Sequence, residues 1–236
     1  MLKETFTFGG INSADIGIVL QKHMEFSEPV PVYESEKIPG RNGNLIFETG
    51  AFENRTGIAK CFALQRDVEK AVAAVNKMLF INRGYARLES SDDPDHYWMA
   101  KAKNGAMLAQ RVRLLAPFDI EFDCKPQRFL VNGENELEFS ETGTLNNEYG
   151  FDARPLVIVT GSGSGVVRVG GATVTIKSMS GTLYLDSETQ NAYNNDGNQN
   201  MNIEAIEFPV LSAGENEVYF SGGVTGLTII PRWWEL

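Results

Sequence analysis

One stretch, residues 64–80, constrains the fold of this chain more than any other. Its apolar side chains recur at spacings of three and four and so share one side of an α-helix: Leu64, Val68, Ala71, Val72, Val75, Met78 and Leu79. Asp67 is the predicted N-cap, and Gly84 supplies the left-handed backbone that ends the helix. The flanking segments are typical of strands, so we expect a sheet folded over this single helix. The helix carries no His or Cys on its apolar side, which predicts an architectural role.

The size and composition of the chain favour a folded β protein with one large domain or two smaller ones. It has 236 residues, of which 42% are apolar, 22% charged and 10% aromatic, a composition that supports a buried core. The formal net charge of −10, with no basic run, disfavours nucleic-acid binding, which needs clustered Lys and Arg. No secretory signal and no membrane-spanning segment are expected from the distribution of apolar residues.

The segment after the first strands has the composition of an edge strand or a projecting arm. Residues 24–36 contain four acidic residues together with Pro29 and Pro31, and proline has no N–H group for a strand ladder. Residues 38–44 are rich in Gly and Asn and predict a turn. Arg41 within it indicates either an anion site or an exposed arginine on a hairpin turn, and composition favours the turn. Strands are predicted in this half at residues 5–8, 16–20, 45–48 and 59–64.

After the helix the sequence predicts further strands. Residues 85–89 and 97–101 are expected to form a hairpin around residues 90–96. Three aspartates and a histidine in that connection suggest a metal site, but their spacing differs from that of a calcium loop, so a solvated loop tip is expected. Residues 107–123 are predicted to form a long strand pair around Pro117.

The composition changes near residue 130, where we place the boundary between an N-terminal domain, residues 1–130, and a C-terminal domain, residues 131–236. Short strands separated by turn residues predict an all-β sandwich: 137–140, 156–160, 166–169, 173–176, 181–186, 217–220 and 227–231. The Gly-Ser run at 161–165 lacks the lysine and the following helix of a phosphate-binding loop, so it is predicted to be a flexible hairpin turn.

Catalytic residues, cofactor ligands and metal ligands are not predicted, and the chain is not expected to be an enzyme. Asp186 and Glu188 are close in sequence, as the two acids of a glycosidase can be, but they precede a solvated Asn-rich loop. Neither His23 nor His96 has a nearby serine or cysteine in the sequence context of a nucleophile elbow. The two cysteines, Cys61 and Cys124, lie in predicted apolar strands and are expected to be buried free thiols.

Four aromatic residues of the C-terminal half are candidates for a surface role: Tyr184, Tyr193, Trp233 and Trp234. Aromatic ring faces can stack on sugars, which suggests a platform for carbohydrate. They can equally anchor the last strand in the core or form a docking surface for another protein. Packing or docking is the favoured interpretation.

Several motifs, in this order, resemble the distal tail (Dit) proteins of long-tailed, non-contractile bacteriophages. The likeness lies in FTFGG and SADIGI near the start, IPGRNG at 38–43, FDCKPQRF at 122–129, and LYLDSE, AY, FPVL, GEN and PRWW in the second half. This resemblance implies a mainly β fold: a sandwich or barrel-like N-terminal domain with one α-helix, followed by a galectin-like all-β sandwich.

The resemblance also implies a structural virion protein of the tail tip, made in the host cytoplasm. Its N-terminal domains would form a hexameric ring, or two stacked rings, around a channel through which DNA passes. The ring would join the tail-tube protein to the baseplate hub (tail-associated) protein, and the C-terminal domain would serve as a platform for receptor-binding proteins. Neither a cofactor, a membrane nor sequence-specific nucleic acid is implied.

The candidate interface residues of such a ring are Pro29, Pro31, Arg41 and Asn42, with Arg41 expected to pair with an acidic group of a neighbouring copy. The alternative is a carbohydrate-binding module or small adhesin of the β-sandwich type, in which Trp233 and Trp234 would contact sugar. A hydrolase that uses Asp186 or Glu188 is the weakest of the three interpretations.

Overall fold

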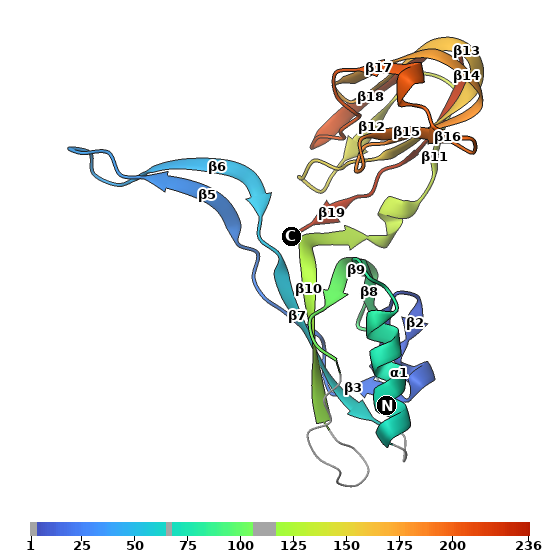
Figure 1. Ribbon diagram of the computed structural model, residues 1–236. Helices are drawn as coiled ribbons and strands as arrows, with labels where there is room; N and C mark the ends of the chain where they lie inside the picture. The colour runs from blue at the N-terminus through green and yellow to red at the C-terminus, as the bar shows by residue number, and fades with distance from the viewer. Residues whose placement is uncertain (1–3, 65–67, 106–116) are drawn as a thin grey trace. The chain divides into compact units, whose positions relative to one another are not determined.

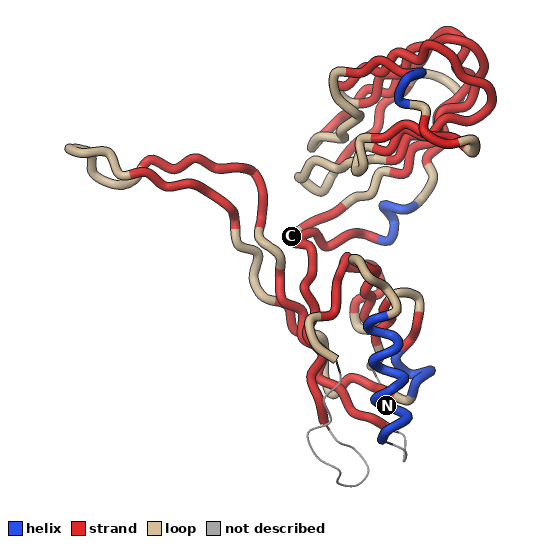
Figure 2. The backbone as a smooth tube through the Cα atoms, in the orientation of Figure 1, coloured by secondary structure: helices blue, strands red, loops and turns tan. Residues whose placement is uncertain are grey.

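The computed structural model describes residues 4–64, 68–105 and 117–236. The chain is mainly β, as predicted, with one α-helix among the described residues, α1 (Val68–Phe80) (Figures 1 and 2). It forms two compact units, the first up to Arg128 together with Leu236, and the second from Phe129 to Glu235. Within the described ranges, no helix has the length and apolar character needed to cross a membrane.

The first unit is built on one antiparallel sheet that curls back on itself. Its strands are β1 (Phe6–Phe8), β2 (Ile11–Asn12), β3 (Ile18–Leu20), β4 (Glu25–Phe26), β7 (Arg55–Ala63), β8 (Ala86–Ser90), β9 (Asp93–Ala102) and β10 (Pro117–Leu130). The strand order is β2-β1-β8-β9-β10-β7-β3, and β4 also pairs with β7. The Leu20 N–H donates to the Glu4 carbonyl oxygen at 2.9 Å, so the β3 side of the sheet returns to the segment that precedes β1.

The helix covers the inner face of this curled sheet, as the sequence predicts. Inward positions alternate along β10 at Phe118, Ile120, Phe122 and Cys124, and the helix buries Ala71, Val75, Met78 and Leu79 in the same cluster. Leu64 is an exception to the predicted stripe, because its side chain is 38% exposed and precedes the helix. The predicted cap at Asp67 and much of the predicted strand pair at 107–123 lie outside the described residues.

Both cysteines of this unit are free and buried in the sheet, as predicted. Burial, reinforced by nearby aspartates, raises the pKa of Cys61 and of Cys124 to about 12. Both thiols therefore stay protonated at neutral pH and act as small apolar groups in the core.

A hairpin leaves the first unit between β4 and β7. Its strands, β5 (Pro31–Glu36) and β6 (Leu45–Phe52), form a separate two-stranded sheet. We call β5, β6 and their connecting loop the arm (Figure 1). Every residue of β5 is exposed, and so is β6 apart from its two end residues. The proline-marked segment predicted to be an edge strand or arm is therefore one strand of a hairpin with solvent on both faces.

The second unit is an antiparallel β structure dominated by three long strands. Its elements are η2 (Val131–Glu134), β11 (Leu137–Phe139), β12 (Gly143–Asn147), β13 (Leu156–Val169), β14 (Ala172–Asp186), β15 (Asn191–Asn194), β16 (Gly197–Asn198), η3 (Asn200–Asn202), β17 (Ile203–Ala205), β18 (Gly214–Ile230) and β19 (Trp234–Glu235). The strand order is β11-β18-β13-β14-β15-β16, with β12 also on β18 and β17 also on β14. Buried Val157 and Val169, at opposite ends of β13, belong to one core cluster.

The predicted hairpin turn at residues 161–165 is wrong, because this run lies inside β13, pairs with β14, and is flanked on its other side by β18, with which Gly161 and Gly165 pair. The register shifts around Gly163, so the strand is irregular there but continues. A methyl group at Gly223 of β18 would overlap the carbonyl oxygen of Ser162. The glycines therefore permit a close approach of two backbones. The short strands predicted on either side merge into β13, β14 and β18.

Candidate functional site

The arm exposes large apolar side chains that no described residue covers. Among them, Tyr33 is 53% exposed, Ile46 55% and Phe47 51%. An isolated two-stranded hairpin is at best marginally stable in water, and exposed apolar patches mark interaction sites. The arm is therefore a candidate protein–protein interface.

The register of the arm gives its two faces different side chains. Glu34 pairs with Phe47, and Tyr33 pairs with Glu48. Residues directly opposite one another in a ladder share a face, and adjacent residues along a strand alternate between faces. Glu34 and Phe47 therefore lie together on one face, and Tyr33 and Glu48 lie together on the other.

The structure brings the four predicted interface residues to this hairpin. Pro31 is the first residue of β5, and Pro29 precedes it by two positions. Arg41 and Asn42 lie in the exposed loop that joins the two strands, where the Arg41 N–H donates to the Ile38 carbonyl oxygen at 3.2 Å. The composition of the sequence predicted the structural role of these prolines and of the turn. The apolar side chains of β5 and β6 were missed, although an apolar segment next to a proline-marked edge is a usable signal.

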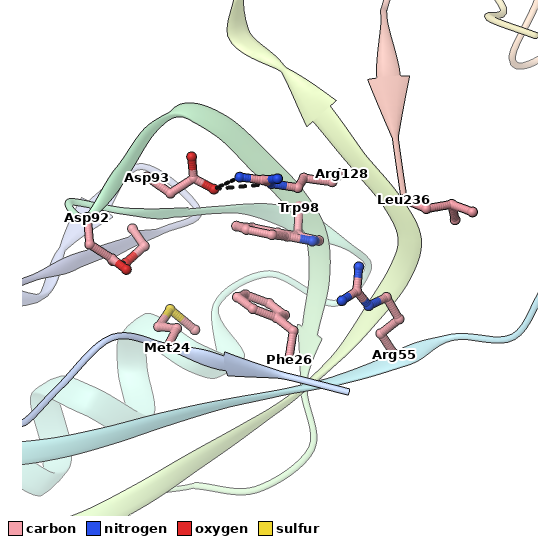
Figure 3. A pocket seen from close by; sticks show the side chains of 9 residues that line it. Met24, Phe26, Arg55, Asp92, Asp93, Trp98, Arg128 and Leu236 are labelled. Atoms are coloured by element: carbon pink, nitrogen blue, oxygen red, sulfur yellow. Dashed lines mark hydrogen bonds and ion pairs between the residues drawn. The ribbon is translucent and has the colours of Figure 1, made fainter. Parts of the chain in front are cut away.

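A pocket of about 250 Å³ lies in the first unit, where the arm begins and ends (Figure 3). Its walls come from β4 and the residue before it, from β7, β8, β9, β10 and the turn between β8 and β9, and from the residue after β19. The lining residues are Met24, Phe26, Arg55, Ser90, Asp92, Asp93, Trp98, Arg128 and Leu236. We call it the Trp98 pocket. Sequence analysis missed it because its lining residues are far apart in the chain.

The indole ring of Trp98 is held by contacts on its faces. The Phe26 ring stacks on it with centroids 4.0 Å apart, and the Arg128 guanidinium lies 5.7 Å from its centroid (Figure 3). The Arg55 guanidinium lies 6.0 Å from the Phe26 centroid, and its Nε donates to the Ser27 carbonyl oxygen at 2.7 Å. These contacts fix the orientation of the aromatic rings and of Arg55.

The two aspartates of the pocket are already paired. Asp93 accepts hydrogen bonds from Arg128 Nη2 at 2.6 Å and lies 2.7 Å from His96 Nδ1. Burial alone would raise the pKa of Asp93, but the hydrogen bonds from His96 and Arg128 outweigh it and hold that pKa below its usual value. Asp92 contacts His23 Nδ1 at 2.8 Å and the Ser90 hydroxyl.

The prediction of a solvated loop tip at residues 90–96 is confirmed in part, because Ser91, Pro94 and Asp95 are exposed, but the connection is shorter and two of the three aspartates are paired. The strand β9 already begins at Asp93, and the side chains of Asp92 and Asp93 are only 20% and 22% exposed. Their carboxylates bond to protein groups of the first unit. Within the described ranges, no three potential metal-ligating side chains come together.

The candidate aromatic residues of the second unit pack largely against neighbouring side chains. Trp233 is 6% exposed and lies against Tyr149 at a centroid distance of 5.9 Å. Trp234 stacks on Phe151 at 4.5 Å, and its Nε1–H donates to the Asp152 carbonyl oxygen. The two tryptophans are thus engaged in packing within the second unit and do not form an open platform on which a sugar could stack.

The tyrosine pair has a different environment. Tyr184 on β14 and Tyr193 on β15 are register partners, half-buried, with stacked rings 5.1 Å apart. The neighbouring Asn-rich loop satisfies many of its amides internally. For example, Asn200 Nδ2 donates to Asn191 Oδ1 and Asn202 Nδ2 donates to Gln199 Oε1.

Of the two carboxylates considered for hydrolysis, Asp186 lies in a structural ion pair. Asp186 accepts a hydrogen bond from Arg232 Nη1 at 2.7 Å. Burial alone would raise the pKa of Asp186, but the hydrogen bond and charge of Arg232 outweigh it and keep that pKa below its usual value. A glycosidase acid needs the opposite shift. Asp186 instead accepts the Glu188 N–H at 3.1 Å and stabilises the local turn.

Comparison with known proteins identifies the fold. Neither a protein-family model nor a curated protein sequence matches the chain. Among solved structures it is similar to the crystal structure of the SPP1 Dit protein (gp 19.1), which is described as a paradigm of the hub adsorption apparatus in phages that infect Gram-positive bacteria. The TM-score is 0.74 at 11% sequence identity, and the match covers 96% of this chain and 98% of that one.

The chain therefore has a Dit-like fold along nearly its whole length, and the sequence resemblance is confirmed at the level of the fold.

Proposed function

We propose that this protein is a structural hub at the distal end of a long, non-contractile phage tail. The observation that supports the proposal most directly is the arm on a Dit-like fold: a hairpin with solvent on both faces whose Tyr33, Ile46 and Phe47 side chains are more than half exposed. Another protein surface that covers this arm would bury those side chains.

The covering surface is a second copy of the chain, in a ring of six copies that stands alone or stacks on another ring. A contact between the arm of one copy and a different surface of the next is heterologous, and heterologous contacts close into rings when the rotation permits. Within the tail, the ring joins the tail-tube protein to the baseplate hub, and the second unit carries the receptor-binding proteins. The net charge of −10 suits a conduit through which DNA passes without adhering.

The loop of the arm supplies a testable contact. Arg41 is exposed and has no ion-pair partner among the described residues, while β5 and β6 carry Glu34, Glu36 and Glu48. In the ring, Arg41 pairs with an acidic group of the neighbouring copy, a charge-assisted hydrogen bond that its guanidinium geometry favours.

The test is the molar mass of the purified protein by light scattering after size exclusion, for the natural chain and for Arg41→Glu. The natural chain is expected at six or twelve times 26.1 kDa, and Arg41→Glu is expected to weaken assembly about 10-fold or more. Arg154→Glu, an exposed change of equal charge in the second unit, is the matched control. Full assembly of Arg41→Glu would remove Arg41 from the interface.

The carbohydrate-binding alternative has less support, because both tryptophans that would contact sugar pack within the second unit. A glycan array with Trp233 and Trp234 substitutions distinguishes the two functions, since a tail hub of this kind needs no glycan signal from those rings.

A further inference from the structure

We propose that the Trp98 pocket binds the side-chain carboxylate of Glu34 from the arm of a second copy. The inference rests on the proposed function, in which arms join copies of the chain, and it assigns the surface that one arm contacts.

The first observation is a buried donor without an acceptor. Trp98 is 4% exposed, and its indole Nε1–H has no hydrogen-bond partner. In Figure 3 the nitrogen edge of the ring is directed toward the side of the pocket where Arg55 lies. Leaving a buried donor unpaired destabilises the folded state. A ligand that supplies an oxygen acceptor at this edge would remove that penalty.

The second observation is the charge of the pocket. Asp93 is paired with Arg128 and His96, and Asp92 with His23. Arg55 is the one charged lining side chain that forms no ion pair with any described residue, and its Nε donates to the Ser27 carbonyl oxygen. The Arg55 guanidinium is therefore available to pair with an anion in the pocket that also contains the unpaired indole N–H. An anionic oxygen acceptor fits this arrangement better than a neutral or cationic group.

The third observation concerns the apolar part of the lining. Met24, Phe26 and Trp98 contribute a thioether and two aromatic rings to the same lining as Arg55. A matching ligand presents a carboxylate beside an apolar group. On the arm, Glu34 and Phe47 are register partners and share one face. Glu34 forms no ion pair with any described residue of its own chain, and Phe47 is 51% exposed. This pair complements the pocket in charge and in polarity.

The position of the pocket agrees with a head-to-tail contact. Phe26 and Arg55 belong to β4 and β7, which lie immediately before and after the arm. An arm that lies against the base of the next arm uses two different surfaces on each copy. Repetition of that contact produces a ring, whereas a pairing of two arms would stop at a dimer.

The test is a double-mutant cycle on assembly, with Glu34→Gln, Arg55→Gln and the combination of both. We expect each single change to weaken assembly about 10-fold or more, and the combination to cost little beyond either single change. Glu48→Gln is the matched control, because Glu48 is equally acidic and exposed but lies on the opposite face of the arm. It is expected to alter assembly less than about 3-fold.

A spectroscopic measurement separates the pocket from general effects on folding. The indole N–H resonance of Trp98, assigned with Trp98→Phe, is expected to move on assembly in the natural chain and to stay in place in Glu34→Gln. The charge swap of Glu34→Arg with Arg55→Glu is expected to recover part of the assembly. Thermal unfolding of each variant, within about 3 °C of the natural chain, excludes loss of the fold as the cause.

Two results would overturn the inference while the ring remains. One is a double variant whose loss of assembly equals the sum of the losses caused by Glu34→Gln and Arg55→Gln alone. The other is an indole shift caused by a short uncharged extension after Leu236, which would show that a group at residue 236 is the acceptor, since Leu236 borders the same pocket. A natural chain that stays monomeric at every concentration would overturn both this inference and the arm-mediated ring.

Discussion

Arg232 combines three unusual features in one residue. It has a left-handed backbone conformation with φ of 58°, its N–H donates to the Gly133 carbonyl oxygen at 2.7 Å, and its guanidinium binds Asp186. A non-glycine residue in this conformation is strained and persists only where the surroundings hold it. Here a backbone hydrogen bond and an ion pair hold it. The pair therefore stabilises the second unit and does not indicate catalysis.

We expect Arg232→Gln to destabilise the second unit by about 1–3 kcal/mol at pH 7, because Asp186 would keep a mostly buried charge without a cation. The pKa of Asp186 is lowered in the folded state, so its stabilising effect is present above the unfolded pKa, about 3.9, and is lost as the pH falls through the lower folded value. The difference between the natural chain and the variant should therefore shrink between about pH 5 and pH 2. Urea unfolding across that range measures it.

Arg168→Gln provides the control for this measurement. Arg168 pairs with Glu217 at 3.3 Å, and both side chains are largely exposed, at 42% and 52%. Exposed pairs contribute little, so an effect below about 1 kcal/mol is expected. Equal losses for Arg168→Gln and Arg232→Gln would contradict the argument from burial.

At the scale of elements, the sequence predicted which residues of a helix or strand face the core better than it predicted where a long strand continues. Apolar periodicity located the helix and the alternating strands, because burial of one face leaves a regular pattern in the sequence. It failed at residues 161–165, where Gly and Ser indicate a turn when only neighbours in sequence are considered. The structure uses the same glycines because the backbones of β13 and β18 approach closely there. That requirement comes from a strand about 60 residues later in the chain, which a local pattern does not reveal.

Gly223→Ala tests this close approach. The added methyl group would overlap the Ser162 carbonyl oxygen, a backbone atom that cannot move without shifting β13. We expect a loss of about 1–3 kcal/mol in the free energy of unfolding of the second unit. Gly171→Ala is the matched control, because a methyl group there meets no atom within 4 Å. A Gly223→Ala protein as stable as the Gly171→Ala protein would contradict the assigned role.

At the scale of the whole molecule, the arm is the part that is least suited to an isolated chain, because it exposes large apolar side chains to solvent. Its prolines and its turn were predictable from composition, but the Trp98 pocket was not. The lining of the Trp98 pocket comes from segments spread between Met24 and Leu236, and only folding brings those residues together. The unpaired indole N–H likewise leaves no trace in the sequence, because Trp98 looks like any other core aromatic residue there.

Removal of the arm should leave the first unit folded. The Ser27 N–H donates to the Thr56 carbonyl oxygen at 2.9 Å, so the two ends of the arm are already joined by a hydrogen bond. We expect a chain with residues 29–53 replaced by a short Gly-Ser linker to unfold within about 5 °C of the natural chain, because almost none of the arm is buried. The same chain should remain monomeric by light scattering.

Circular dichroism and thermal scans provide the control for the arm deletion, since a misfolded first unit would also fail to assemble. A ring formed by the armless chain would place the main interface elsewhere. Loss of the helical signal on deletion would instead assign the arm a role in folding.

The length of β13, β14 and β18 has a mechanical consequence. Each strand runs through the second unit as one element, and β13 pairs with β14 and β18 on both sides of the register shifts near Gly163. Tension applied at one end of these strands is therefore carried along the same strands into the ladders at the other end, so both halves of the unit bear the load. The second unit should yield in a single step under load, as a rigid lever would, so a pull on it is transmitted to the rest of the chain before the unit gives way.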